Sequence, residues 1–162
     1  MKTETIGTLR RDRKGRAVRY ERRYDATPEE VWAALTEPDQ VPNWFAQMTI
    51  EPRAGGRVTF EWATGETEAG VVRAFDPPKT FEYTWEDGSV IRFDLRPDGD
   101  GTLLVLDHRG LTPEQAVDVG PGWHVHLDAL EALLAGSPQT APEWNARAES
   151  LKPAYEAQAK AL

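Results

Sequence analysis

The sequence predicts an α+β fold in which a curved antiparallel sheet wraps around a long helix near the carboxyl terminus. From Met48 to Arg109, apolar residues alternate with polar ones, which is the period of strands with one buried face. Turn residues divide this region into short strands at hairpin spacing, so antiparallel pairing is expected. From Pro121 to Gly136, apolar residues recur at helical spacing, which predicts a helix that closes the core.

Composition narrows the class of protein. A chain of 162 residues suits one globular domain with a short appendage, and the absence of cysteine excludes disulfides and thiolate metal sites. Residues 1–23 carry nine Lys or Arg against three acids, whereas the rest carries ten against twenty-four. An acidic body repels phosphate backbones, so we expect no nucleic-acid binding. No apolar run resembles a signal peptide or a membrane span, and we expect a cytoplasmic protein.

The amino-terminal part predicts a strand hairpin. Residues 6–11 and 16–25 have strand character. They are separated by a turn that contains Lys14 and Gly15, and Gly15 can adopt the positive φ that such turns often require.

Two short helices should follow this hairpin. Thr27, Pro28 and Glu30 have the spacing of a capping box with proline at the first helical position. Residues 39–45 are interrupted by prolines and predict a short second helix or turn.

The later elements have clear apolar faces. In the strand predicted at residues 90–96, Ile91, Phe93 and Leu95 share the inward face. In the long helix, the apolar stripe includes Trp123 and Leu130, and Gly136 is placed to end it. A further stripe from Trp144 to Tyr155 predicts a carboxy-terminal helix, broken or kinked near Lys152, that docks on the domain or on a partner subunit.

A series of short motifs is spread over most of the chain. They are Thr27-Pro28-Glu29-Glu30-Val31-Trp32 with Leu35-Thr36, Trp44, Gly56, Gly70-Val71-Val72, Pro77-Pro78, Tyr83-Thr84-Trp85, Gly101-Thr102-Leu103, His108-Arg109-Gly110-Leu111, and Gly122-Trp123 with Leu127 and Leu130. In this order they resemble bacterial proteins of the family named after the activator of heat-shock protein 90 ATPase. That family is similar to START-like proteins of the SRPBCC superfamily.

The resemblance implies a helix-grip fold. We expect six to seven antiparallel strands curved around the long helix, two short helices after the first long strand, and a carboxy-terminal helical extension. The expected division is a basic strand or arm at residues 1–15, the helix-grip domain at 16–136 and the extension at 137–162. Because this fold serves many activities, it does not determine the function.

In a helix-grip fold, the space between sheet and long helix can hold a small hydrophobic molecule, aromatic or lipid-like. Alternatively, the large rings fill the interior and leave no cavity. The predicted walls are Met48, Phe60, Trp62, Tyr83, Trp85 and Phe93 from the sheet, Trp123, His126 and Leu130 from the long helix, and Trp44 and Phe45 from the short helix.

The histidines give little sign of catalysis or metal binding. His124 and His126 lie two apart on a helix, so their rings diverge and cannot readily share a metal. His124 falls on the polar side of that helix, whereas His126 can point at the pocket. His108 can reach the pocket rim. We assign no metal, no cofactor and no catalytic residue.

Three functions therefore stay open. The first is binding of a small hydrophobic molecule. The second is a protein-interaction or chaperone-associated stress-response module, which would use the outer sheet and the Trp144 helix. The third is a cyclase or hydratase that uses His126 and Tyr83. A homodimer formed through the Trp144 stripe is also open.

Overall fold

The computed structural model describes residues 7–13, 15–62, 64–137 and 141–162. Ile6 of the predicted first strand and Lys14 of the predicted turn lie outside these ranges. The elements are β1 (Thr8–Asp12), β2 (Gly15–Tyr24), α1 (Pro28–Thr36), the 3-10 helix η1 (Val41–Asn43), β3 (Gln47–Ile50), β4 (Arg57–Glu61), β5 (Thr67–Asp76), β6 (Thr80–Thr84), β7 (Val90–Asp98), β8 (Gly101–Leu111), α2 (Pro113–Leu134) and α3 (Ala141–Lys160).

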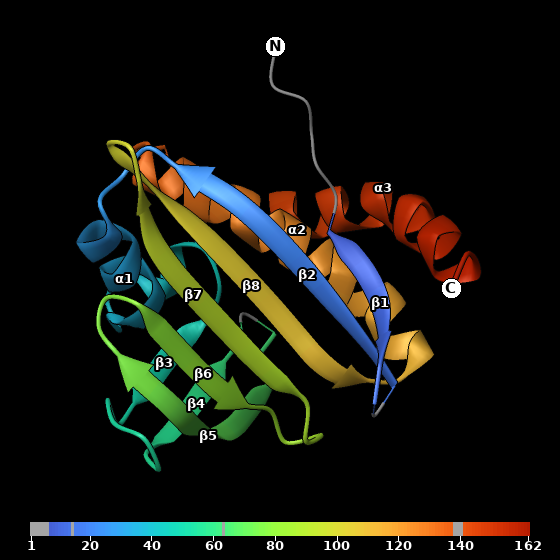
Figure 1. Ribbon diagram of the computed structural model, residues 1–162, viewed down its shortest axis with the longest axis horizontal. Helices are drawn as coiled ribbons and strands as arrows, with labels where there is room; N and C mark the ends of the chain where they lie inside the picture. The colour runs from blue at the N-terminus through green and yellow to red at the C-terminus, as the bar shows by residue number, and fades with distance from the viewer. Residues whose placement is uncertain (1–6, 14, 63, 138–140) are drawn as a thin grey trace.

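The strands form one antiparallel sheet, and α2 crosses the face that the sheet curves around (Figure 1). The strand order is β1-β2-β8-β7-β6-β5-β4-β3. This arrangement confirms the predicted α+β helix-grip fold. The sheet has eight strands rather than the expected six to seven, because β1 pairs with β2 from Thr8 to Asp12 and extends the sheet.

The first helix begins as its sequence predicts. The Thr27 side chain accepts a hydrogen bond from the backbone N–H of Glu30, and the Glu30 carboxylate accepts one from the backbone N–H of Thr27. Both members of the capping box are therefore present. The second element is a short helix flanked by turns, which confirms the predicted short helix or turn: Val41–Asn43 is helical, and Trp44 and Phe45 lie on the loop that follows.

The long helix begins earlier than predicted. It starts at Pro113 rather than Pro121, because Thr112 and Gln115 form a second capping box at its amino terminus. Pro121 lies inside the helix, where it removes one backbone donor. The Tyr20 hydroxyl donates to the carbonyl of Gly120 and joins the helix to β2 at this point. The sequence pattern was misread here because proline was taken as a helix start.

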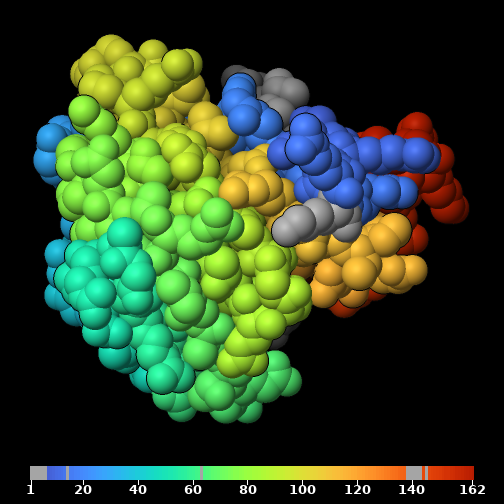
Figure 2. Space-filling view, turned by 60° about the horizontal axis from the view of Figure 1, so that its bottom comes forward, coloured from blue at the N-terminus to red at the C-terminus, as the bar shows by residue number. Residues whose placement is uncertain are grey.

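The carboxy-terminal helix docks on its own domain. It continues through Pro153, so the predicted break near Lys152 is absent from this described segment. Tyr155 is fully buried, and its hydroxyl accepts a hydrogen bond from the backbone N–H of Gly7 at 2.8 Å. Figure 2 shows the two ends of the described chain, β1 in blue and α3 in red, close together. Among the described helices, none is both long and apolar enough to span a membrane.

Candidate functional site

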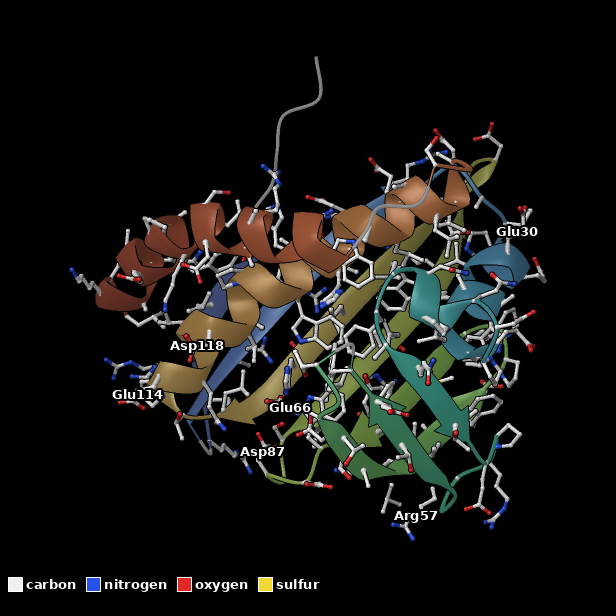
Figure 3. The ribbon with its side chains drawn as sticks, turned by 180° about the vertical axis from the view of Figure 1, so that it is seen from behind. Glu30, Arg57, Glu66, Asp87, Glu114 and Asp118 are labelled. Carbon is white, nitrogen blue, oxygen red and sulfur yellow. The ribbon has the colours of Figure 1, made fainter. Side chains whose placement is uncertain are left out.

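The predicted wall residues meet between the sheet and α2, where ring side chains crowd together (Figure 3). All of the predicted set is buried except Trp62 and His126, which are half-buried. Leu130 is fully buried in the same core. We use the term aromatic cluster for Phe45, Phe60, Trp62, Tyr83, Trp85, Phe93 and Trp123.

Phe45 is the centre of the aromatic cluster. Its ring is nearly parallel to that of Trp123, with 5.1 Å between centroids and 7° between planes. It also makes edge contacts with Trp62 at 4.7 Å and with His126 at 4.9 Å. Phe45 therefore occupies the middle of the predicted ligand space, although it is carried by a loop rather than by the sheet or α2.

A hollow of about 300 Å³ lies elsewhere, beside β3 and β4. It is lined by Pro38, Pro42, Gln47, Met48, Thr49, Thr59, Glu61 and Thr67. Met48 alone belongs to the predicted wall residues. This hollow has a mixed polar lining and is separate from the space that Phe45 fills.

A buried chain of hydrogen bonds holds Trp123 in place. The indole N–H of Trp123 donates to Nδ1 of His108 at 2.9 Å, and Nε2 of His108 lies 2.9 Å from Oγ of Ser89. Indole nitrogen only donates, so Nδ1 accepts and Nε2 of the neutral ring carries the proton. Ser89 in turn donates to Asp87 at 2.6 Å.

This arrangement is not a serine nucleophile with its base. Because Nε2 of His108 donates to Ser89, it cannot take the Ser89 proton. Ser89 is also completely buried. Burial lowers the pKa of His108 to about 4, which keeps the ring neutral at physiological pH. The network therefore orients Trp123, one wall of the aromatic cluster, and His108 does not stand at a pocket rim.

His126 points into the region of the aromatic cluster, as predicted. Nδ1 of His126 lies 2.8 Å from the backbone carbonyl of Trp44, so Nδ1 carries the proton and donates it. Burial lowers the pKa of His126 to about 4, with an opposing contribution from the Trp44 carbonyl. At neutral pH, Nε2 is therefore an uncharged acceptor, and the described residues give it no hydrogen-bond partner.

His124 lies beside Asp128, on the polar side of α2 as the sequence predicts, but that side is not open to solvent at His124. Its side chain is completely buried, because α3 covers this side of α2. Nδ1 of His124 lies 3.0 Å from the Tyr155 hydroxyl, and the ring meets Tyr20 edge-on. Helical periodicity within α2 could not reveal that another helix would cover this side.

Trp144 belongs to the site and was not predicted there. Its ring lies 5.2 Å from that of His126 at 69°, and its buried indole N–H has no hydrogen-bond partner in the described chain. The sequence showed Trp144 on an apolar stripe, but not which surface the stripe covers. It covers the protein's own core, where Leu151 and Tyr155 are buried.

Acidic side chains gather next to the aromatic cluster. Burial raises the pKa of Glu68, and the nearby charges of Asp87, Glu86 and Glu66 raise it further. The labelled Glu66 and Asp87 lie on neighbouring loops (Figure 3). Burial raises the pKa of Tyr83 well above its usual value, and Glu68 adds to this shift. This edge of the site disfavours anions. Over the described residues, no group of three His, Asp or Glu could hold a metal ion.

A sheet curved around a long helix, with an aromatic interior between them, defines a START-like helix-grip protein of the SRPBCC class. Residues 25–135 match the family described as activator of Hsp90 ATPase homolog 1-like protein. The chain belongs to this family. A search of curated proteins found no match.

Several solved structures are similar over most of the chain. The crystal structure of CalU16 from Micromonospora echinospora has 30% identity and a TM-score of 0.77, and the match covers 94% of this chain and 95% of that one. Protein MLL2253 from Mesorhizobium loti has 30% identity and a TM-score of 0.69, over 76% of this chain and 99% of that one.

A third structure shows the same fold at lower identity. The Aha1 dimer from Colwellia psychrerythraea has 21% identity and a TM-score of 0.66, over 73% of this chain and 95% of that one. A homodimer therefore occurs with this fold.

Proposed function

We propose that this protein binds a small hydrophobic molecule, aromatic or lipid-like, between the sheet and α2. Its family and fold support the proposal, because SRPBCC proteins commonly enclose hydrophobic ligands. The observation that carries it is the position of Phe45. Phe45 is carried by a loop, and its ring fills a slot between rings from the sheet and rings from α2.

A ligand ring that replaces Phe45 would meet the same faces and edges. It would bury apolar surface worth about 25 cal/mol per Å² but would have to compensate for the contacts that Phe45 loses. Loop residues can rearrange at lower cost than residues of paired strands. A ring system larger than one phenyl group would gain more contact than Phe45 gives up, which favours bicyclic or longer apolar ligands.

The variant Phe45→Ala tests this proposal. Removing the buried ring should reduce the free energy of unfolding by about 3–5 kcal/mol. If the fold survives, it should open the slot, so naphthalene should bind at least about tenfold more tightly than to the wild type. The measurement is isothermal titration calorimetry, with near-ultraviolet circular dichroism to check the fold.

Phe81→Ala is the matched control. Phe81 is also buried, and its ring contacts Trp32 and Phe75 on the α1 side of the core. It reaches the aromatic cluster at Tyr83 and Phe93, but makes no ring contact with Phe45, Trp62 or Trp123 among the described residues. Naphthalene should bind Phe45→Ala more tightly than Phe81→Ala. Equal affinity for the two folded variants, or no binding to either, would contradict the assignment of the slot. The homodimer, the protein partner and enzymatic turnover stay predictions from the sequence.

A further inference from the structure

His126 and Trp144 each carry a hydrogen-bonding group that has no partner among the described residues, and both lie on one side of the aromatic cluster. Nε2 of His126 is an acceptor, because Nδ1 donates its proton to the Trp44 carbonyl at 2.8 Å. The indole N–H of Trp144 is a donor that is buried without a partner in the described chain. Their ring centroids are 5.2 Å apart. Buried donors are rarely left unpaired, so the Trp144 N–H calls for an explanation.

The surroundings of this pair are aromatic. Around His126 the rings of Phe45, Trp62 and Trp123 have centroids 4.9, 5.9 and 6.5 Å away, and Trp144 completes the set. The low pKa of His126 keeps it uncharged at neutral pH. A neutral imidazole offers no positive charge to pair with an anion, so a fatty-acid carboxylate would be disfavoured here.

We propose that His126 and Trp144 recognise the hydroxyl group of an uncharged aromatic ligand, a phenol or naphthol in its chemistry. One hydroxyl can donate to Nε2 of His126 and accept from the Trp144 N–H, which satisfies both groups at once. The ring that bears the hydroxyl would take the place of the Phe45 ring, against Trp62 and Trp123. This inference rests on the proposed function and specifies its ligand.

A set of probes tests the hydroxyl without any change to the protein. The probes are naphthalene, 2-naphthol and 2-methoxynaphthalene, titrated by calorimetry into the full-length wild type and Phe45→Ala at neutral pH. 2-Naphthol should bind about tenfold more tightly than naphthalene, the effect expected from two modest hydrogen bonds. 2-Methoxynaphthalene cannot donate, so most of this gain should disappear.

Two variants test whether His126 and Trp144 cause the tighter binding of 2-naphthol. His126→Phe removes the acceptor and should make the affinities for 2-naphthol and naphthalene nearly equal. Trp144→Phe removes the donor but keeps a ring, and should reduce the preference about threefold. Trp32→Phe, whose indole packs against Phe75 away from the site, should leave the preference unchanged.

The outcomes separate the two proposals. If naphthalene binds but 2-naphthol binds no more tightly, the proposed hydroxyl recognition is wrong, whereas the proposed hydrophobic ligand site at Phe45 is supported. A preference that persists in folded His126→Phe would also overturn the hydroxyl recognition. If none of the probes binds the wild type or Phe45→Ala, the proposed function and this inference both fail.

Discussion

At the residue scale, two histidines adopt opposite neutral tautomers. His108 accepts at Nδ1 from Trp123, whereas His126 donates from Nδ1 to the Trp44 carbonyl. The first histidine has both ring nitrogens paired inside the protein and orients a wall of the aromatic cluster. The second has no partner for Nε2 among the described residues. The same residue type therefore has a structural role in β8 and a proposed binding role in α2.

Ser89→Ala tests the structural role of His108. It removes the acceptor that faces the Nε2 proton and leaves a buried donor unpaired, which should lower the free energy of unfolding by about 1–3 kcal/mol. Urea unfolding followed by tryptophan fluorescence measures the change. Ser150→Ala, at an exposed serine of α3, is the control and should change stability by less than about 0.5 kcal/mol. Equal changes in the free energy of unfolding for the two variants would show that the hydrogen bond between Ser89 and His108 does not stabilise the fold.

Sequence alone could predict some residues of the site and not others. His126 was placed by helical spacing, because that spacing determines which side of α2 faces the sheet. Ser89 and Trp144 lie on other elements, far from His108 and His126 in the chain. Their roles depend on tertiary packing, which a local period does not encode. Phe45 was assigned to one wall of the pocket, yet its ring lies at the centre of the aromatic cluster, on a loop that follows the short helix.

At the element scale, close packing of α2 against α3 depends on a glycine. A Cβ atom at Gly120 would lie 2.6 Å from the ring of Tyr155, whereas a Cβ atom at Gly122 would have no described atom within 4 Å. Both glycines lie inside α2, two residues apart. The packing around them differs, and Gly120 also precedes Pro121, where an added Cβ disfavours the helical conformation.

Gly120→Ala should therefore destabilise the protein, and Gly122→Ala should not. The first forces Tyr155 away from α2 at an expected cost of about 1–3 kcal/mol. The second replaces glycine in a helix interior and should add about 0.5–1 kcal/mol of stability. Urea unfolding gives both free energies, and hydrogen exchange should show faster opening of α3 only in Gly120→Ala. Similar free energies for the two variants would mean that α3 is not packed as described.

At the scale of the whole molecule, the fold was more predictable than the site. Strand period, turn residues and the Thr27 cap are local features, and together they were sufficient for an antiparallel sheet and the first helix. The helix-grip arrangement came from the resemblance to a known family. The start of α2 was predicted wrongly, because Pro121 was taken as the first residue of the helix. The capping box at Thr112 is also a local sequence feature, but it was not used. Whether the interior holds a cavity depends on how the rings pack, which is a property of the assembled molecule.

Burial of the histidines makes global stability depend on pH. The pKa is lowered to about 4 in His108 and His126, and it is also lowered in His124, in each case mainly by burial. In the unfolded chain these rings bind protons below about pH 6.5, whereas in the native state burial shifts their protonation to lower pH. Stability should therefore be complete above this pH and fall as the pH decreases toward 4. The raised pKa of Glu68 acts in the opposite direction over part of this range.

The contribution of one ring can be isolated by comparing wild type with His126→Phe at pH 7 and pH 5. For a pKa of about 4 in the native state, His126 should account for about 1–2 kcal/mol of the loss between these values. The variant should lose correspondingly less stability in urea unfolding, because Glu68, His108 and His124 are common to both proteins and cancel in the difference. An identical loss in the two proteins would show that His126 titrates normally in the folded state. Its Nε2 would then carry a proton at mildly acidic pH and could not serve there as the neutral acceptor for a ligand hydroxyl.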